Sequence, residues 1–339
     1  MKIGAVVVTF NRLEKLKKAL SYFDAQTEKP AYVIVVDNAS TDGTGAFLAE
    51  WAGPAQKQTE APAGTQNGTQ AQMPGQVLEQ KTGQASPGDF RRIVLTLPSN
   101  QGGSGGFYAG LKYAMDIPDV DWIWVSDDDA YPKEDAFELA SKYLDQAGDL
   151  SGISAICGKI IKNGQHDLNH GKYYKLKGIK ISECRVPESE YRKPEFEMHN
   201  LTYVAAIMNK AKLREVGLPY KEFFIYWDDL EHGIRMDKAG RIIGVPSVVA
   251  YHDTPPENDE LSWKYYYALR NMTYTYTIHF KGLPFEYYAL KVRIKLLYNR
   301  LTGRKNLKLN MLDAAFHDGL AGKLGLHEIY RPGWKPDRK

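Results

Sequence analysis

The sequence of 339 residues has little cysteine and no strong excess of charge. Its two cysteines, Cys157 and Cys184, are too few for a disulfide framework and fit a reducing compartment, although a single disulfide between them stays open. The chain has 44 Lys and Arg residues against 41 Asp and Glu residues, and a net charge of +3 provides no global polycation. We therefore expect no nucleic-acid partner.

The sequence also lacks long apolar runs. No segment approaches the roughly 20 apolar residues that a membrane-spanning helix needs. Met1–Val8 runs straight into an apolar segment of β-strand type, and it has neither the helical apolar region nor the cleavage site of a signal peptide. We expect a cytoplasmic protein, with peripheral contact at the inner face of the cell membrane as an open alternative.

The N-terminal segment has the pattern of a β-α-β unit. Ile3–Val8 and Tyr32–Val36 are continuous apolar runs, as expected for parallel strands covered on both faces. Leu13–Phe23, between them, has apolar residues at helical spacing. This order predicts a right-handed parallel crossover, with a ligand crevice where polar residues follow the strands. Further strands are predicted at Arg91–Leu97, Ile153–Cys157, Leu201–Met208 and Ile242–Val249.

Residues 53–89 interrupt this α/β pattern. They are rich in Gln, Gly, Ala, Thr and Pro, contain no aromatic residue and show no apolar periodicity. Such a composition cannot offset the entropy lost on ordering, so we predict a low-complexity, mobile surface loop.

Three consecutive carboxylates, Asp127–Asp129, follow the apolar run Asp121–Ser126. Like charges at a strand end are costly unless a cation or strong donors neutralise them. Carboxylate oxygens suit Mg²⁺ or Mn²⁺, which favours a phosphate-bearing ligand, and the imidazole of His252 after a later strand is a reasonable third ligand. The simpler interpretation is an acidic turn that caps a helix beginning near Ala130. The other motifs decide against it.

A glycine-rich segment, Ser99–Phe107, precedes a helix predicted over Ala109–Met115. Its glycines permit close backbone approach, and the N-terminus of a helix attracts anions. The segment lacks the Gly-Lys-Ser/Thr ending of a P-loop and the spacing of a dinucleotide fingerprint, so alone it is a weak signal. Its place between two strands, at the sheet edge that holds the aspartates, makes it part of the predicted ligand site.

A second polar group follows the aromatic run Phe223–Trp227. Asp228 and Asp229 stand at the mouth of a predicted helix, where neighbouring aromatic rings raise a carboxylate's pKa towards that of a general base. The simpler interpretation makes Asp228 an N-cap and pairs Glu231 with Arg235 one helical turn apart. We accept that interpretation for the Glu231–Arg235 pair only.

Together the motifs give a specific resemblance to a known family. In chain order they are Val6–Arg12, Val36–Gly43, Asn100–Gly106, Asp127–Asp129, Trp227–Glu231, His252 and Arg270–Asn271. The chain resembles the inverting glycosyltransferases of family 2 over about residues 1–276, apart from the insert, and within them the bacterial galactofuranosyl- and rhamnosyltransferases. The resemblance implies a GT-A fold: an α/β fold with a Rossmann-like, mostly parallel central sheet flanked by helices.

The resemblance also implies roles for the matching residues. Nine of them would contact the nucleotide-sugar donor: Thr9, Arg12, Asp37, Asn100, Gly102, Gly103, Ser104, Asp127 and Asp128. Mn²⁺ or Mg²⁺ would lie on the diphosphate, held by Asp127, Asp129 and His252. Asp229 would be the general base, while Asp228 would orient the acceptor or share that task. Trp227 would offer an apolar face to a sugar ring.

The implied reaction is a single in-line displacement that inverts the anomeric carbon. UDP-galactofuranose or dTDP-rhamnose would be the donor, and a hydroxyl of a growing, lipid-linked cell-surface glycan the acceptor, as in cell-wall polysaccharide biosynthesis. A nucleotidyltransferase is disfavoured because the turn Thr9–Arg12 is not a basic, glycine-rich signature. A non-catalytic nucleotide- or glycan-binding scaffold of a polysaccharide assembly complex is the remaining alternative. It predicts a lost base or metal ligand, yet all of those residues are present.

Residues 277–339 are predicted to form a basic, amphipathic helical extension of the catalytic domain. Between Lys281 and Lys308, eight basic residues and many apolar ones accompany the single acid Glu286. Such a helix can lie on anionic lipid, or it can pack on the core with a solvated basic face. Both alternatives stay open.

Overall fold

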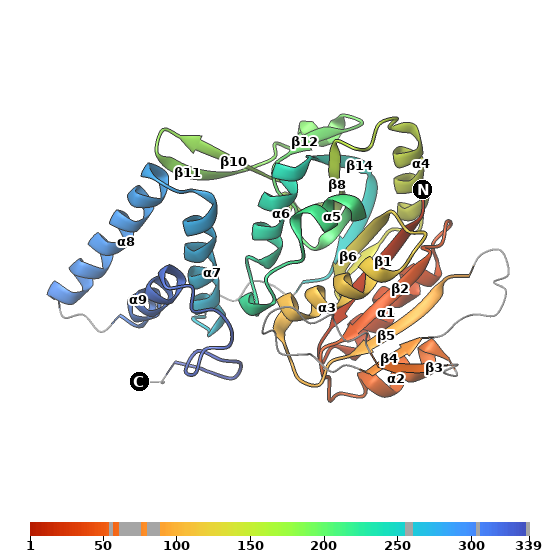
Figure 1. Cartoon of the computed structure of the whole chain (residues 1–339), viewed down its shortest axis with the longest axis horizontal. Helices are drawn as coiled ribbons and strands as arrows, with labels where there is room; N and C mark the ends of the chain where they lie inside the picture. The colour runs from red at the N-terminus through yellow and green to blue at the C-terminus, as the bar shows by residue number, and fades with distance from the viewer. Residues whose placement is uncertain (54–56, 61–75, 80–88, 255–259, 303–305, 337–339) are drawn as a thin grey trace.

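The computed structural model describes residues 1–53, 57–60, 76–79, 89–254, 260–302 and 306–336 (Figure 1). Its strands are β1 (Ile3–Thr9), β2 (Tyr32–Asp37), β3 (Lys57–Glu60), β4 (Gln76–Glu79), β5 (Arg91–Thr96), β6 (Trp122–Asp127), β7 (Ala130–Pro132), β8 (Ile153–Lys162), β9 (Gln165–His166), β10 (Lys172–Lys177), β11 (Lys180–Arg185), β12 (Phe196–Met198), β13 (Val204–Asn209) and β14 (Arg241–His252). Its α-helices are α1 (Leu13–Asp24), α2 (Thr44–Ala52), α3 (Gly102–Asp116), α4 (Ala136–Gln146), α5 (Lys210–Val216), α6 (Asp228–Ala239), α7 (Lys264–His279), α8 (Leu283–Thr302) and α9 (Leu307–Leu320), with short 3₁₀ turns at Glu190–Arg192 and Lys221–Phe223.

One mixed sheet runs through the molecule in the order β12-β14-β8-β13-β6-β1-β2-β5-β4-β3, while β7 pairs with β14 and β9 with β8. Its central strands β5, β2, β1 and β6 are mutually parallel, as the β-α-β pattern predicts. Strand β13 then runs antiparallel between β6 and β8, and β14 returns parallel to β8. The expected α/β fold with a parallel central sheet and flanking helices is confirmed.

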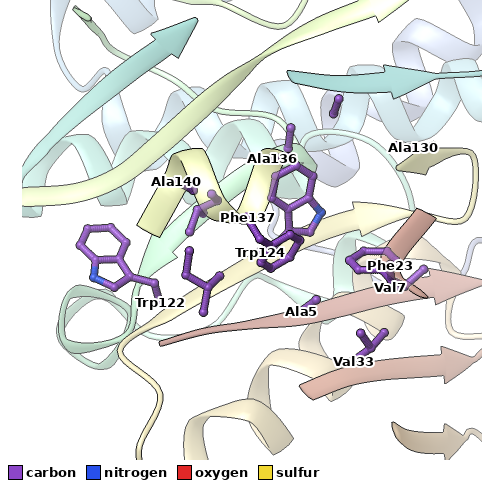
Figure 2. Close-up of a cluster of buried hydrophobic side chains, with 14 of the residues drawn as sticks. Ala5, Val7, Phe23, Val33, Trp122, Trp124, Ala130, Ala136, Phe137 and Ala140 are labelled. Carbon is purple, nitrogen blue, oxygen red and sulfur yellow. The ribbon is translucent and has the colours of Figure 1, made fainter. Parts of the chain in front are cut away.

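The central strands are apolar throughout because both of their faces are covered. Alternate side chains point to opposite faces of a strand, so Ala5 and Val7 of β1 join one core while Val6 and Val8 join the other. Figure 2 shows the first of these cores, where Trp124 packs against Phe137 of α4 with ring centroids 5.4 Å apart. The rigid, doubly covered sheet holds its strand ends in fixed positions.

The glycine-rich segment is not a loop before a helix, as the sequence suggested, but the first part of helix α3, which begins at Gly102. Packing explains its glycines. A Cβ at Gly106 would lie 2.4 Å from Cγ1 of Val8, and a Cβ at Gly110 would lie 2.4 Å from Cγ1 of Val6. Interiors leave no room for such overlaps, so the small residues let α3 approach β1 closely.

Ala130–Pro132 form strand β7 and α4 begins only at Ala136, so the aspartate triplet caps no helix and the simpler interpretation set aside above is wrong. The expectation of a mobile loop changes in part. Residues 57–60 and 76–79 of the expected mobile loop form β3 and β4, which continue the sheet beyond β5. Backbone pairing that satisfies the open edge of β5 explains these strands. Of the other residues of the expected loop, 54–56, 61–75 and 80–88 lie outside the described residues.

The C-terminal helices α7, α8 and α9 form a helical unit beside the sheet domain (Figure 1). Tyr266 and Tyr267 of α7 share an apolar cluster with Met311 and Ala315 of α9. The boundary expected between residues 276 and 277 therefore falls inside α7, which packs with the extension. No helix in the described part of the chain combines the length and apolar character needed to cross a bilayer.

Candidate active site

Three predicted site residues lie side by side at the carboxyl edge of the central sheet. The parallel register pairs Thr9 with Asp37, and Val8 with Asp127, so the ends of β1, β2 and β6 meet there. Polar groups at such an edge line the ligand crevice of α/β folds. Asp37 is buried, and its Oδ1 accepts a hydrogen bond of 2.9 Å from the backbone N–H of Ser40.

Cations bind two of the three aspartates, although burial still raises the pKa of Asp128. Arg12 Nη1 donates to Asp128 Oδ1 at 3.0 Å and to Asp129 Oδ2 at 2.9 Å. Lys15 Nζ, one turn into α1, also donates to Asp129 Oδ2 at 3.0 Å, and the Thr9 hydroxyl donates to Asp128 Oδ2 at 2.7 Å. Although burial opposes it, the nearby imidazole of His252 and the hydrogen bond from Lys15 hold the pKa of Asp129 below its usual value.

Asp127 has no such compensation. Burial first, and then the neighbouring charges of Asp129 and Asp128, raise its pKa well above the usual value, and Arg12 offsets this only in part. A carboxylate in such surroundings is stabilised by an added cation. The sequence reasoning that the triplet needs a positive charge therefore applies to Asp127 above all.

Strand pairing brings His252 to the triplet. In the antiparallel ladder of β7 and β14, His252 pairs with Ala130, and its Nε2 lies 3.6 Å from Asp129 Oδ1. Its Nδ1 is buried and finds no hydrogen-bond partner among the described residues. The imidazole Nε2 beside Asp129, together with the carboxylates, is a donor set that Mn²⁺ or Mg²⁺ accepts.

The proposed metal ligands nevertheless do not form a closed cage. Within the described parts of the chain, no three His, Cys, Asp or Glu side chains are arranged to hold a metal ion. Mg²⁺ is usually bound by one or two carboxylates together with phosphate oxygens of the substrate. The residues therefore fit a cation that arrives with a phosphate ligand, and the assignment of Asp127, Asp129 and His252 stays a prediction.

Two asparagines fix the start of α3 next to the aspartates. Asn38 Nδ2 donates to the carbonyl of Gly102 at 2.7 Å, and Asn38 Oδ1 accepts from the N–H of Gln101 at 2.8 Å. Asn100 Oδ1 accepts from the N–H of Gly102 at 2.8 Å. The predicted donor ligand Asn100 thus has a structural task. Beyond its chain neighbours and the backbone of its own helix, no atom of the described residues lies within 4 Å of a Cβ built on Gly103, which leaves space beside it for a ligand.

Buried side chains from α7 hold the segment that presents the second pair of aspartates. Asn271 Nδ2 donates to the carbonyls of Phe223, Ile225 and Tyr226 at 3.0, 3.0 and 2.8 Å. The buried Arg270 donates to the carbonyls of Glu222 and Phe223 as well. These bonds compensate an unusual backbone, because Phe224, Tyr226 and Trp227 have φ values of 67°, 64° and 69°.

Asp228 and Asp229 begin helix α6 as predicted, although Trp227 occupies the N-cap position. Burial is the main cause that raises their pKa values, to about 7 for Asp228 and about 6 for Asp229. The charge of Asp228 is also among the smaller causes that raise the pKa of Asp127, so the two aspartate groups lie near enough to interact. The indole of Trp227 packs edge-on against Tyr276, with ring centroids 5.7 Å apart.

The pair that the sequence assigned to helix stabilisation has that role. Arg235 Nη2 lies 2.8 Å from Glu231 Oε2, and His279 Nε2 of α7 lies 2.9 Å from Glu231 Oε1. Glu231 is fully buried and therefore needs both partners. This triad ties α6 to α7, and Asp228 and Asp229 at the first positions of α6 take no part in it.

Sequence reasoning missed two cations of the site. Lys15 reaches Asp129, and its place one turn after Arg12 on α1 was an available signal. Lys264, the first residue of α7, lies close enough to Arg12, Asp127 and Asp129 to feel their charges, and burial first and Arg12 second lower its pKa. No local signal marked Lys264, because it lies far from these partners in the chain.

Known proteins share both the sequence pattern and the fold. Residues 5–60 and 76–217 match the model of glycosyl transferase family 2. The galactofuranosyltransferase GlfT1 of Mycolicibacterium smegmatis is 32% identical over 256 residues, which cover 74% of this chain and 70% of that protein.

Two solved structures, both under 25% identical, show the same fold. TarS 1–349 of S. aureus in complex with UDP-GlcNAc has a TM-score of 0.55 and 15% identity, over 94% of this chain and 81% of that one. The mannosyltransferase PcManGT from Pyrobaculum calidifontis in complex with GDP-Man and Mn²⁺ has a TM-score of 0.50 and 15% identity, over 94% and 75%. The family match covers more than half of the chain and agrees with the sheet and the site geometry. The chain is therefore a member of glycosyltransferase family 2, with a GT-A-like fold.

Proposed function

We propose that this enzyme transfers a sugar from a nucleoside-diphosphate donor to an acceptor hydroxyl by one inverting displacement. The observation that carries the proposal is that aspartates with unlike pKa values lie near one another. Arg12 and Lys15 bind Asp129 and its pKa lies below the usual value, whereas burial raises the pKa values of Asp228 and Asp229. Such a difference separates a charge-binding role from an acid–base role.

The donor is proposed to bind over the carboxyl edge of the sheet. Asp37 and Thr9 lie at adjacent strand ends, where a nucleoside would contact them, and the open space beside Gly103 would take the sugar, with the buried Ser104 next to it in α3. Lys264 and Arg12 bring positive charge to the place where Asp127 and Asp129 lie. Their charges would stabilise the diphosphate as it leaves with the bonding electron pair.

A divalent cation fits this leaving-group site. Asp127, Asp129 and His252 would hold Mn²⁺ or Mg²⁺, which supplies Lewis-acid stabilisation of the leaving diphosphate when bound. The mannosyltransferase relative, solved with GDP-Man and Mn²⁺, supports this proposal. Within the chain itself, the raised pKa of Asp127 and the position of His252 Nε2 beside Asp129 support it as well.

Asp229 is proposed as the general base and Asp228 as the residue that orients the acceptor. Asp228 is only 7% exposed, whereas Asp229 is half-buried and so more accessible to an incoming hydroxyl. Asp229 would take the hydroxyl proton while the oxygen attacks the anomeric carbon from the face opposite the diphosphate. The exposed Tyr226 and half-buried Trp227, next to it in the chain, offer apolar surface for the acceptor sugar.

We propose UDP-galactofuranose as the donor and a glycan as the acceptor. The identity of 32% to a galactofuranosyltransferase supports this sugar, and the fold of TarS, solved with UDP-GlcNAc, supports a uridine nucleotide. No observation on this chain favours dTDP-rhamnose, which serves as the comparison donor in the test below.

The test is transfer from UDP-galactofuranose, dTDP-rhamnose, UDP-galactopyranose and UDP-GlcNAc to short glycan acceptors, measured by mass spectrometry with Mn²⁺. Thermal unfolding with each donor is recorded in parallel, because a ligand at a hundredfold excess over its Kd adds about 2.7 kcal/mol to the stability of the native state. Transfer and stabilisation with UDP-galactofuranose alone are expected. Stabilisation without transfer to any acceptor would favour the non-catalytic scaffold, and transfer from another donor would refute the proposed sugar.

A further inference from the structure

Helix α8 lies at the edge of the molecule away from the central sheet, with α7 between them (Figure 1). One face of α8 is buried. Ala289, Val292 and Leu296 pack with Leu312 and Phe316 of α9 in a small apolar cluster. Tyr288 of α8 also hydrogen-bonds Thr273 of α7, so α8 is held on the protein by side chains away from the outward face.

The opposite face of α8 is apolar as well, and it is exposed. Six large side chains on it are between 54% and 77% exposed: Leu283, Leu290, Ile294, Leu297, Tyr298 and Leu301. At about 100° of rotation per residue, these six fall within an arc of about 100° that lies roughly opposite the inner face. We call these six residues the outer stripe. A helix that only packs on a core shows polar residues on such a face.

Basic side chains border the outer stripe on both sides. The same helical rotation places Lys291 and Lys295 along one border and Arg293 and Arg300 along the other, and all four are exposed. Arg300 also pairs with Asp313 of α9 at 3.1 Å while its side chain stays 64% exposed. The single acid of α8 is Glu286, so the face has a clear excess of positive charge.

We propose that the outer stripe of α8 binds the protein to the surface of an anionic lipid bilayer. An apolar arc between two basic borders is the pattern of a helix that lies in the plane of a membrane interface. Its apolar side chains enter the boundary between headgroups and acyl chains, while the lysines and arginines contact acidic headgroups. The basic C-terminal helix was expected either to lie on lipid or to pack on the core with a solvated basic face. The exposed apolar stripe favours contact with lipid.

Charge complementarity decides against a second copy of this chain as the occupant. If two copies paired through the outer stripe, the basic borders of one α8 would face the basic borders of the other. With one glutamate on each helix, these cations would find few partners, and like charges across a helix contact are unfavourable. An anionic lipid surface supplies the opposite charge along the whole helix.

The docked helix is mechanically tied to the candidate active site. The helix before it, α7, carries Asn271, which holds the segment ahead of Asp228, and Tyr276, whose ring packs against Trp227. Binding through α8 would therefore hold the aspartates at a set distance from the lipid surface. This arrangement suits an acceptor that is itself anchored in the bilayer.

The test is co-sedimentation of the full chain with vesicles, without donor, acceptor or metal. Vesicles of phosphatidylglycerol and phosphatidylcholine in equal amounts are compared with vesicles of phosphatidylcholine alone. We expect at least tenfold more bound protein on the anionic vesicles, and a loss of this binding at high salt because the charges are then screened.

Three variants locate the binding surface. The triple change Leu290→Gln, Ile294→Gln and Leu297→Gln should lower vesicle binding at least tenfold, and so should Lys291→Glu with Arg293→Glu and Lys295→Glu. The matched control is Leu326→Gln with Ile329→Gln, two residues that are 57% and 62% exposed but lie outside α8, and it should bind like the unchanged protein. Because all of these residues are exposed, unfolding temperatures should stay alike.

Two results would overturn the proposal. One is equal vesicle binding by the unchanged protein and the glutamine variant. The other is self-association in sedimentation velocity that the glutamine variant abolishes, combined with no vesicle binding, which would make the stripe an interface between copies. Neither result bears on sugar transfer, since a water-soluble acceptor tests that reaction separately.

Discussion

The side-chain amide of Asn271 donates a hydrogen bond of 2.8 Å to the backbone carbonyl of Tyr226. The two residues lie 45 positions apart in the chain, on α7 and on the segment ahead of α6. The same amide also serves two more carbonyls of that segment. One buried side chain thus keeps the left-handed backbone before Asp228 in place.

We expect Asn271→Asp to lower both stability and activity. The aspartate has the same shape, but it replaces a donor with an acceptor facing three carbonyls. Leaving these groups unsatisfied costs about 1–3 kcal/mol, and displacing the catalytic segment by about 1 Å can cost about 10²-fold in rate. Thermal unfolding and kcat measure the two effects. The control Asn310→Asp, at an exposed position of α9, should leave both unchanged.

Asp229→Asn should abolish most of the sugar transfer while donor binding persists. A general base contributes about 10²–10⁴-fold to a rate, so kcat should fall by that factor, and the Kd for the nucleotide should change little. Asp237→Asn on the same helix is a matched control. Transfer at the original rate by Asp229→Asn would remove this residue as the base and direct attention to Asp228.

The rate should depend on pH through the Asp228–Asp229 pair. The base must be ionised, and burial raises the pKa values of these carboxyls to about 7 and about 6. Transfer should therefore increase as pH rises from about 5 to 8, with apparent pKa values that belong to the pair. Removing one negative charge in Asp228→Asn should move the remaining transition to lower pH. A profile that is flat between pH 5 and 8 would contradict the assignment.

The same pair should lower stability as pH rises. Because both pKa values are raised above the ordinary aspartate value of about 3.9, the folded protein keeps protons that the unfolded chain has lost. The contribution of these groups to the free energy of unfolding is therefore full below about pH 4 and declines as pH rises through 6 to 7. Chemical denaturation of Asp228→Asn and of the unchanged protein across this range isolates the effect as a difference in slope.

Removal of divalent metal should stop transfer. We expect EDTA to abolish turnover, Mn²⁺ or Mg²⁺ to restore it, and Asp127→Asn to raise the metal concentration needed for half activity at least tenfold. The control Asp135→Asn alters an aspartate that pairs with Lys133 away from the site. Full activity in EDTA would instead leave Arg12, Lys15 and Lys264 as the groups that stabilise the diphosphate.

Two neighbouring glycines should respond oppositely to alanine. A Cβ at Gly106 would lie 2.4 Å from Val8, so Gly106→Ala should destabilise the fold by about 1–3 kcal/mol through overpacking. A Cβ at Gly103 meets no atom of the described residues within 4 Å beyond its own helix, so Gly103→Ala should stabilise helix α3 by about 0.5–1 kcal/mol. If the donor sugar uses the space beside Gly103, the same change should raise the KM for the donor. Urea denaturation and steady-state kinetics measure these effects.

The sequence by itself determined the elements that follow local rules. Apolar runs such as Ile3–Val8 have a period that predicts covered strands, and Thr9, Asp37 and Asp127 stand where those strands end. Parallel strands bring their carboxyl ends to one edge, so the position of each residue in the chain was enough to predict their meeting. The Glu231–Arg235 pair, one helical turn apart, could be read in the same way.

Only the tertiary structure decided which groups meet across long separations of chain. Lys264 reaches the aspartates, and Asn271 supports Tyr226, because α7 packs back against the sheet domain. The sequence predicted a loop for the glycines of α3, whereas in the structure they lie in a helix because α3 packs closely on β1. Likewise, the sequence did not show which apolar residues of α8 face a core and which face the solvent. The position of α9 buries one set and leaves the other exposed. Periodicity reports which residues share a face, but only packing decides what that face touches.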